Sequence, residues 1–81
     1  MCGFAGFVHQ PAPAAELEAR ARAMADAIAT RGPDDSGTWA DPEAGYAVGH
    51  RRLAILDLSP LGHQPMVAGD LVLAYNGEIY N

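Results

Sequence analysis

Residues 14–30 read AAELEARARAMADAIAT, and this stretch predicts the one long helix of the chain. Ala, Glu and Arg are among the strongest helix formers. Four apolar side chains recur every three or four residues and form one narrow stripe: Leu17, Ala21, Met24 and Ile28. Gly32 is expected to cap the end in a left-handed conformation, and Pro33 prevents continuation. We therefore expect an amphipathic helix with one face packed on a sheet.

Short apolar runs on both sides of this helix predict strands. Residues 3–8 (GFAGFV) and 71–75 (LVLAY) are expected to be buried strands, and 38–40 a short one. Residues 45–56 (GYAVGHRRLAIL) predict a long strand that is interrupted near Gly49. One helix among several strands indicates an α/β or α+β architecture. The last strand would keep an open edge, so we expect residues 1–81 to be part of a larger domain.

Length and charge restrict the classes of protein that fit. The 81 residues carry ten acidic side chains and five basic ones, with a net charge of −5. That balance argues against nucleic acid and against an anionic membrane surface as partners. No run approaches the roughly 18 apolar residues of a spanning helix, and the start lacks the pattern of a signal peptide. With a single cysteine and thus no disulfide framework, a cytoplasmic location is expected.

Cys2 is the first residue that suggests chemistry. A lone cysteine is commonly a small buried hydrophobe. Position 2 offers another interpretation, because removal of Met1 would make Cys2 the N-terminal residue. A free α-amine titrates at about 7.7–8.0 and a cysteine thiol at roughly 8.5, so the two are matched for proton transfer near neutral pH. Cys2 is thus a candidate nucleophile whose own amine serves as its base.

Asn76 and Gly77 are the second candidate. Asn-Gly is the commonest dipeptide of tight hairpin turns, which is the structural interpretation. The functional alternative is an oxyanion hole, made by the side-chain amide of Asn76 and the backbone N–H of Gly77.

Two adjacent arginines interrupt an apolar run. In a strand, Arg51 and Arg52 would point to opposite faces. One is expected to be solvated, while the other could hold a substrate carboxylate in a bidentate pair. His50 and His63 are expected to be polar loop or strand-end residues. No spacing of ligands indicates a metal site.

Six short motifs occur in order along the chain: CG at 2–3, RGPD at 31–34, HRRLAI at 50–55, DLS at 57–59, GHQPM at 62–66 and NGEIYN at 76–81. Taken together, these motifs resemble one family. The chain resembles the start of the glutamine-hydrolysing asparagine synthetases, in the N-terminal part of their class II glutamine amidotransferase domain. The resemblance spans essentially all 81 residues, and the middle motifs separate this branch from the related glucosamine-phosphate synthases and phosphoribosyl amidotransferases.

The resemblance implies an Ntn-hydrolase fold, an αββα four-layer sandwich of which this chain would supply the N-terminal portion. It implies that Cys2 attacks the side-chain amide of L-glutamine, releasing ammonia through a glutamyl thioester. Asn76 and Gly77 would donate to the oxyanion, and Arg52 would hold the α-carboxylate. The remaining residues implied to bind glutamine are Leu53, Ala54, Ile55, Leu56 and Glu78.

The same resemblance implies partners outside this stretch. The rest of the amidotransferase domain and an ATP-dependent synthetase domain would follow, and the latter would bind ATP, Mg²⁺ and aspartate. No cofactor is expected in residues 1–81, a homodimer is expected of the full-length protein, and the 81-residue fragment alone is expected to be inactive. Two alternatives stay open: a truncated, non-catalytic remnant, and a paralogue that amidates a different acceptor.

Overall fold

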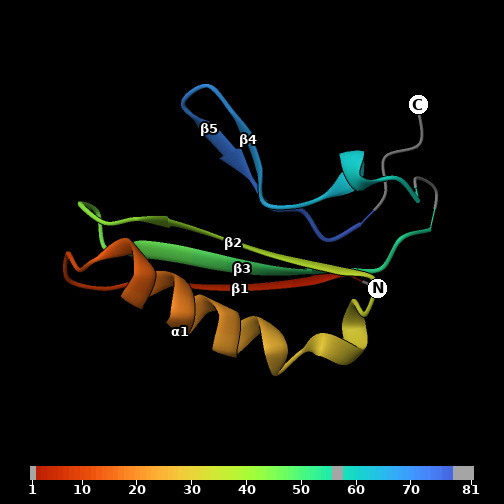
Figure 1. Cartoon of the computed structure of the whole chain (residues 1–81), viewed down its shortest axis with the longest axis horizontal. Helices are drawn as coiled ribbons and strands as arrows, with labels where there is room; N and C mark the ends of the chain where they lie inside the picture. The colour runs from red at the N-terminus through yellow and green to blue at the C-terminus, as the bar shows by residue number, and fades with distance from the viewer. Residues whose placement is uncertain (1, 56–57, 78–81) are drawn as a thin grey trace.

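A three-stranded antiparallel sheet lies in the middle of the structure (Figure 1). The structure is a computed structural model, and it describes residues 2–55 and 58–77. The strands are β1 (Gly3–Val8), β2 (Asp35–Asp41) and β3 (Tyr46–Arg52), in the order β1-β3-β2. β3 pairs with β2 over its full length and with β1 from Tyr46 to Arg51, so it forms the centre of the sheet.

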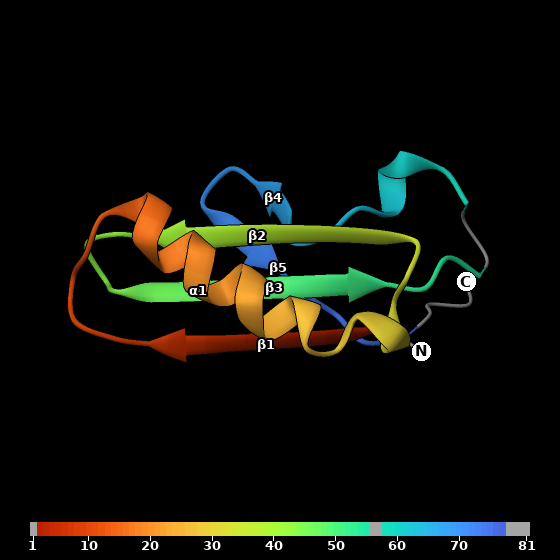
Figure 2. The same ribbon diagram turned by 60° about the horizontal axis from the view of Figure 1, so that its bottom comes forward.

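Helix α1 (Ala14–Asp26) covers one face of this sheet (Figure 2). The predicted stripe is correct at Leu17 and Ala21, which are buried together with Ala47 of β3. It is wrong at Met24, which is 37% exposed, because Ala25 takes the next buried position. The core under the helix therefore consists mainly of small side chains that let α1 approach the sheet closely.

Gly49 shows how close this approach is. A Cβ added at Gly49 would lie 2.6 Å from the carbonyl oxygen of Ala21 and 2.9 Å from Cβ of Ala25. The predicted interruption of the strand near Gly49 is wrong, because this residue pairs in register with Ala5 and Thr38. Glycine occurs here because the helix backbone occupies the space of a side chain, not because the strand breaks.

The ends of two predicted elements also differ. The helix stops at Asp26 and a short 3₁₀ turn, η1 (Ala29–Arg31), follows it. Gly32 has φ −150°, so the predicted left-handed cap is wrong. β3 ends at Arg52 rather than at residue 56, because the next two N–H groups leave the ladder: Leu53 donates to Cys2 Sγ and Ala54 to Asp34.

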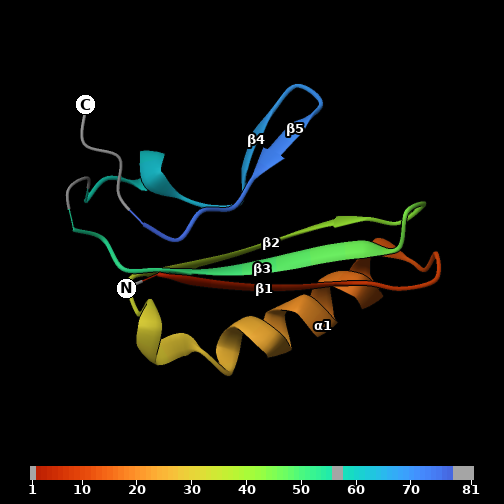
Figure 3. The same ribbon diagram turned by 180° about the vertical axis from the view of Figure 1, so that it is seen from behind.

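A two-stranded hairpin lies on the side of the sheet opposite α1 (Figure 3). Its strands are β4 (Met66–Ala68) and β5 (Leu71–Leu73), and the 3₁₀ turn η2 (Pro60–Gly62) precedes them. β4 was not expected from the sequence. The prediction of a buried strand at 71–75 is wrong in extent and in burial, since Leu71 is 75% exposed.

β1 is not a buried strand either. Its side chains alternate, and Phe4 and Val8 point to the face opposite the helix, where they are 50% and 78% exposed. The chain is of the α+β class, as expected, with the order helix, sheet, hairpin from one side to the other (Figure 1). Among the described helices, none has the length and apolar character needed to cross a membrane.

Candidate active site

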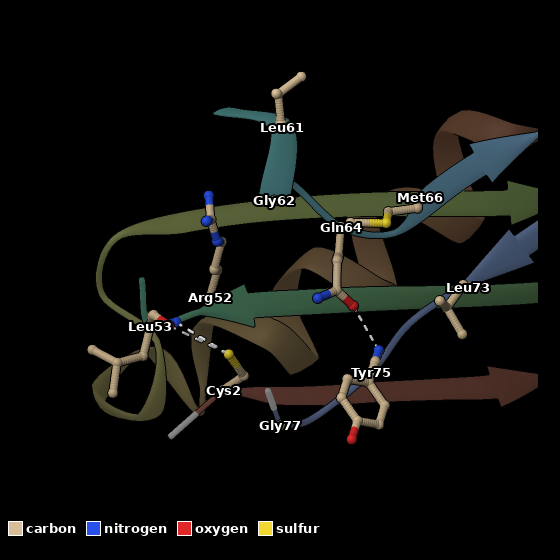
Figure 4. Close-up of a pocket in the computed structure, with 10 residues that line it drawn as sticks. All are labelled: Cys2, Arg52, Leu53, Leu61, Gly62, Gln64, Met66, Leu73, Tyr75 and Gly77. Atoms are coloured by element: carbon tan, nitrogen blue, oxygen red, sulfur yellow. Dashed lines mark hydrogen bonds between the residues drawn. The ribbon is translucent and has the colours of Figure 1, made fainter. Parts of the chain in front are cut away.

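Cys2 lies directly before β1 and is buried, with 6% of its surface exposed. Pairing of β1 with β3 brings the residue beside the segment that follows β3. There the N–H of Leu53 donates to Cys2 Sγ at 3.3 Å, and the thiol lies 3.7 Å from the carbonyl oxygen of Leu53 (Figure 4). The backbone of Leu53, 51 positions away in the sequence, thus fixes the position of the Cys2 sulfur.

A pocket of about 240 Å³ opens over this sulfur, between the sheet and the hairpin. Four residues singled out from the sequence line it: Cys2, Arg52, Leu53 and Gly77. The wall is completed by residues from η2 to the segment after β5, including Gln64 and Tyr75 (Figure 4). The structure therefore brings the candidate nucleophile, a cation and a candidate oxyanion donor into one cavity.

Arg52 and Arg51 point to opposite faces of the sheet, as the alternation predicts. Arg52 is buried on the pocket side, where its Nη1 donates to the Ser59 carbonyl at 2.7 Å. A Cβ at Gly62 would lie 2.2 Å from Arg52 Nη2, so η2 packs tightly against the guanidinium. The expectation that the other arginine is solvated is wrong, because the side chain of Arg51 is 16% exposed and its Nε donates to the Gly32 carbonyl at 2.9 Å.

Asn76 and Gly77 follow β5 and lie next to Cys2. The side-chain amide of Asn76 hydrogen-bonds to two neighbours. Its nitrogen donates to the Cys2 carbonyl at 2.9 Å, and its oxygen accepts from Arg31 Nη2 at 3.1 Å. Gly77 has φ 151°, a conformation that favours glycine. The pair does not form the turn of the described hairpin, which lies between Ala68 and Leu71.

The other predicted glutamine-binding residues lie outside this pocket or outside the described residues. Ala54 donates its N–H to Asp34 Oδ2 at 2.8 Å, and Ile55 is 55% exposed. Neither is among the described residues that line the cavity around Cys2. Leu56 and Glu78 lie outside the described part of the chain.

Sequence reasoning missed two polar side chains at or next to the site: Gln64, which lines the cavity, and His50, which contacts a residue that lines it. His50 was expected to be a polar loop or strand-end residue, but it is completely buried in β3 and contacts the Tyr75 carbonyl. Burial lowers the pKa of His50 below its ordinary value, although that carbonyl partly opposes the shift. Gln64 contacts Tyr75 as well. The GHQPM motif was the only signal for Gln64, and it did not indicate a partner.

A second, more open pocket adjoins the first on the other side of Arg52. Asp35 and His63 line it, and their side chains are 2.5 Å apart. Burial alone would raise the pKa of Asp35, but the hydrogen bonds from His63 and from the Ser36 N–H outweigh it and lower this pKa. No thiol lines this pocket within the described residues, so the cavity that contains Cys2 is the candidate active site.

The arrangement suits acyl transfer to a thiol. Such chemistry uses a sulfur nucleophile with backbone or amide donors near it, and Cys2 has Asn76 and Gly77 beside it. The buried guanidinium of Arg52 favours a substrate that carries a carboxylate.

Comparisons with known proteins agree with this chemistry. The family model described as "Glutamine amidotransferase domain" matches residues 1–81. The chain is 45% identical to asparagine synthetase [glutamine-hydrolyzing] 2 of Bacillus subtilis and 38% identical to the putative asparagine synthetase [glutamine-hydrolyzing] 2 of Methanocaldococcus jannaschii. Both matches cover 100% of this chain, but 11% and 19% of those proteins.

Another relative carries a different name. The amidase chry2 of Gibberella zeae is 35% identical, with 100% of this chain and 14% of that protein covered. The chain spans between a tenth and a fifth of the length of these curated relatives. No solved structure matches the chain. Since the family model covers every residue, the chain belongs to the glutamine amidotransferase domain family, in the part that glutamine-hydrolysing asparagine synthetases share.

Proposed function

We propose that this chain carries the nucleophile of a glutaminase, and that Cys2 attacks the side-chain amide carbon of L-glutamine. A bond forms between Sγ and that carbon, the C–N bond breaks, and ammonia leaves with the proton of the thiol. Water then hydrolyses the glutamyl thioester to glutamate and regenerates the thiol. The observation that carries this proposal is that Cys2, Arg52 and Gly77 line one cavity.

The base in this mechanism is the α-amine of Cys2, which becomes free when Met1 is removed. An N-terminal amine with a reference pKa of about 7.7–8.0 is partly unprotonated at pH 7 and can accept the thiol proton. It can then pass this proton to the leaving ammonia, which is the general acid–base role in both directions. A retained Met1 would convert the same nitrogen into an amide without useful basicity.

The donors of the oxyanion hole are assigned to Asn76 and Gly77. The Asn76 amide nitrogen carries two hydrogens, and one of them holds the Cys2 carbonyl. The second hydrogen and the N–H of Gly77 are the donors that we assign to the developing negative charge. Each such donor contributes about 2.7–4 kcal/mol to acyl transfer.

Arg52 is assigned to the α-carboxylate of glutamine. Its buried guanidinium lies on the wall that Cys2 shares, so a carboxylate paired with it would direct the side chain of glutamine toward the sulfur. The further glutamine-binding roles are proposed for residues 53–56, through their backbone groups, and for Glu78, toward the α-amino group.

The remaining proposals concern the full-length protein. Residues 1–81 are the N-terminal fragment of the amidotransferase domain, and the exposed apolar side of β1, with Phe4 and Val8, is covered in the complete αββα sandwich. A synthetase domain takes the ammonia and uses ATP and Mg²⁺ to amidate aspartate. ATP and Mg²⁺ belong to that domain, and no residue of this chain is assigned to hold them. We place the protein in the cytoplasm, as a homodimer.

A different acceptor is the second candidate. The amidase chry2 shares the whole of this chain at 35% identity under a name that is not asparagine synthetase. A segment similar to this one therefore occurs in a protein that is not named asparagine synthetase. On this proposal, residues outside 1–81 select the molecule that accepts the ammonia.

The test is a comparison of nitrogen sources in the full-length protein. Cys2→Ala should reduce glutamine-dependent amidation of aspartate by at least about 10³-fold, because the nucleophile is lost, while amidation with free ammonia stays near the wild-type rate. Equal loss with both nitrogen sources would contradict the assignment of Cys2 to glutamine hydrolysis. Hydrolysis of glutamine without amidation of aspartate would favour the second candidate, and absence of both activities in the wild type would favour a non-catalytic remnant.

A further inference from the structure

Both backbone groups of Tyr75, its N–H and its carbonyl, contact side chains. Its N–H donates to Gln64 Oε1 at 2.6 Å, and its carbonyl lies 3.0 Å from His50 Nε2. β5 ends at Leu73, so these two groups are beyond the ladder of the hairpin. Tyr75 directly precedes Asn76 and Gly77. Two side chains thus replace the sheet partners of the backbone immediately before the candidate oxyanion donors.

His50 is well suited to hold a carbonyl in a fixed place. It lies in the central strand, it is completely buried, and its Nε2 faces a carbonyl oxygen, which can only accept. A carbonyl partner places the ring proton on Nε2. Nδ1 of the same ring is buried without a hydrogen-bond partner among the described residues. Burying this unpaired nitrogen has a cost, and among the described residues the one hydrogen bond of the ring is that of Nε2 to Tyr75.

Gln64 contacts the other backbone group of Tyr75, its N–H. It precedes β4, lines the cavity that contains Cys2, and points its amide oxygen toward the Tyr75 N–H (Figure 4). The segment before β4 and the segment after β5 are thereby joined at the mouth of the hairpin. Movement of either segment would carry Asn76 and Gly77 away from Cys2.

We propose that His50 and Gln64 are positioning residues, which hold Tyr75 so that Asn76 and Gly77 present their N–H groups to the carbonyl of glutamine. This inference rests on the proposed glutaminase function. Neither side chain is assigned a contact with the reacting atoms. Donors to an oxyanion act mainly in the transition state, so losing their placement lowers kcat and leaves the KM for glutamine nearly unchanged.

Matched substitutions in the full-length protein test the proposal. His50→Gln keeps an N–H near the position of Nε2, whereas His50→Asn is one bond too short to reach the carbonyl. Gln64→Glu keeps an acceptor oxygen, whereas Gln64→Met has similar size and no comparable acceptor. We expect His50→Asn and Gln64→Met to lower the kcat of glutamine hydrolysis about 10- to 100-fold, and the Gln and Glu variants to stay within about threefold of wild type.

A second measurement separates positioning from a general structural defect. Alkylation of Cys2 by iodoacetamide needs an accessible thiol and no oxyanion hole, so its rate should be unchanged in all four variants. Equal kcat values within each pair, or alkylation rates that fall together with kcat, would overturn the proposal. If His50→Asn does not fold, the Gln64 pair decides alone, because Gln64 is in a loop and only half-buried. A wild type without Cys2-dependent hydrolysis would instead refute the proposed function.

Discussion

Gly62→Ala is expected to weaken glutamine binding without unfolding the protein. The added Cβ would lie 2.2 Å from Arg52 Nη2 and 2.4 Å from its Cζ, where ordinary contact needs 3.4 Å or more. The guanidinium must therefore move by more than about 1 Å, which is enough to break a bidentate pair with a carboxylate. Because the clash involves the end of a flexible side chain and not the backbone, the arginine moves and the fold tolerates the change.

The magnitude follows from the contact that is lost. A hydrogen bond to a charged group contributes about 1.5–3 kcal/mol, which corresponds to roughly a 10- to 100-fold increase in the KM for glutamine. The carboxylate does not react, so it is bound equally in the ground and transition states, and kcat should change little. Steady-state glutaminase kinetics of the full-length protein measure both values.

The control is Gly69→Ala in the hairpin turn. Among the described residues, a Cβ at Gly69 would contact nothing within 4 Å, although its φ of 59° makes the substitution locally strained. This variant should lose some stability and keep its KM. The reasoning about Arg52 would be refuted if Gly62→Ala kept the wild-type KM, or if it lowered kcat alone.

Three further predictions concern the fold. Gly49→Ala should destabilise the full-length protein by about 1–3 kcal/mol in urea denaturation, because the added Cβ would lie 2.6 Å from the backbone oxygen of Ala21. An unchanged denaturation midpoint would contradict the close helix–sheet contact. Leu17 is 1% exposed, so Leu17→Ala should lower the free energy of unfolding by about 2–5 kcal/mol. Arg20 forms an exposed 3.2 Å ion pair with Glu16, so Arg20→Ala should lower it by less than about 1 kcal/mol. Similar losses in the two variants would show that the core is elsewhere. The folded pKa of His50 is below its ordinary 6.5, so the unfolded state binds the proton more readily, and stability should decrease as the pH falls from about 6.5 through the folded pKa. When melting temperatures are measured between pH 5 and 7.5, those of wild type and His50→Gln should diverge only below about pH 6.5. A parallel pH dependence of the two proteins would exclude the contribution of His50.

The elements with local signals were predictable from the sequence. The composition and spacing of residues 14–30 predict a helix, which the structure has over Ala14–Asp26. The alternation across Arg51 and Arg52 predicts their opposite faces. The fold class followed from these elements. Cys2, Arg52 and Gly77 were identified through short motifs and lie together at one pocket.

The errors arose where contacts distant in sequence decide the outcome. Met24 fits the apolar period, but the approach of α1 to Gly49 leaves room only for Ala25. Phe4 has the large apolar side chain of a core residue, yet in the described part of the chain it is 50% exposed. His50 and Gln64 were not assigned to the site because their partner is the backbone of Tyr75, which has no signature in the sequence.

The most direct test of the account is to map covalent modification of the protein by a glutamine-mimicking electrophile, such as a diazoketone analogue of glutamine. Two preparations are compared by intact mass and by the mass of the N-terminal peptide: one with Met1 removed, and one in which Met1 is retained. The account predicts one adduct per chain, located on Cys2, in the preparation without Met1, and none in the other. An adduct on a different residue, or equal labelling of Cys2 with Met1 still attached, would contradict the claim that the freed amine activates this thiol.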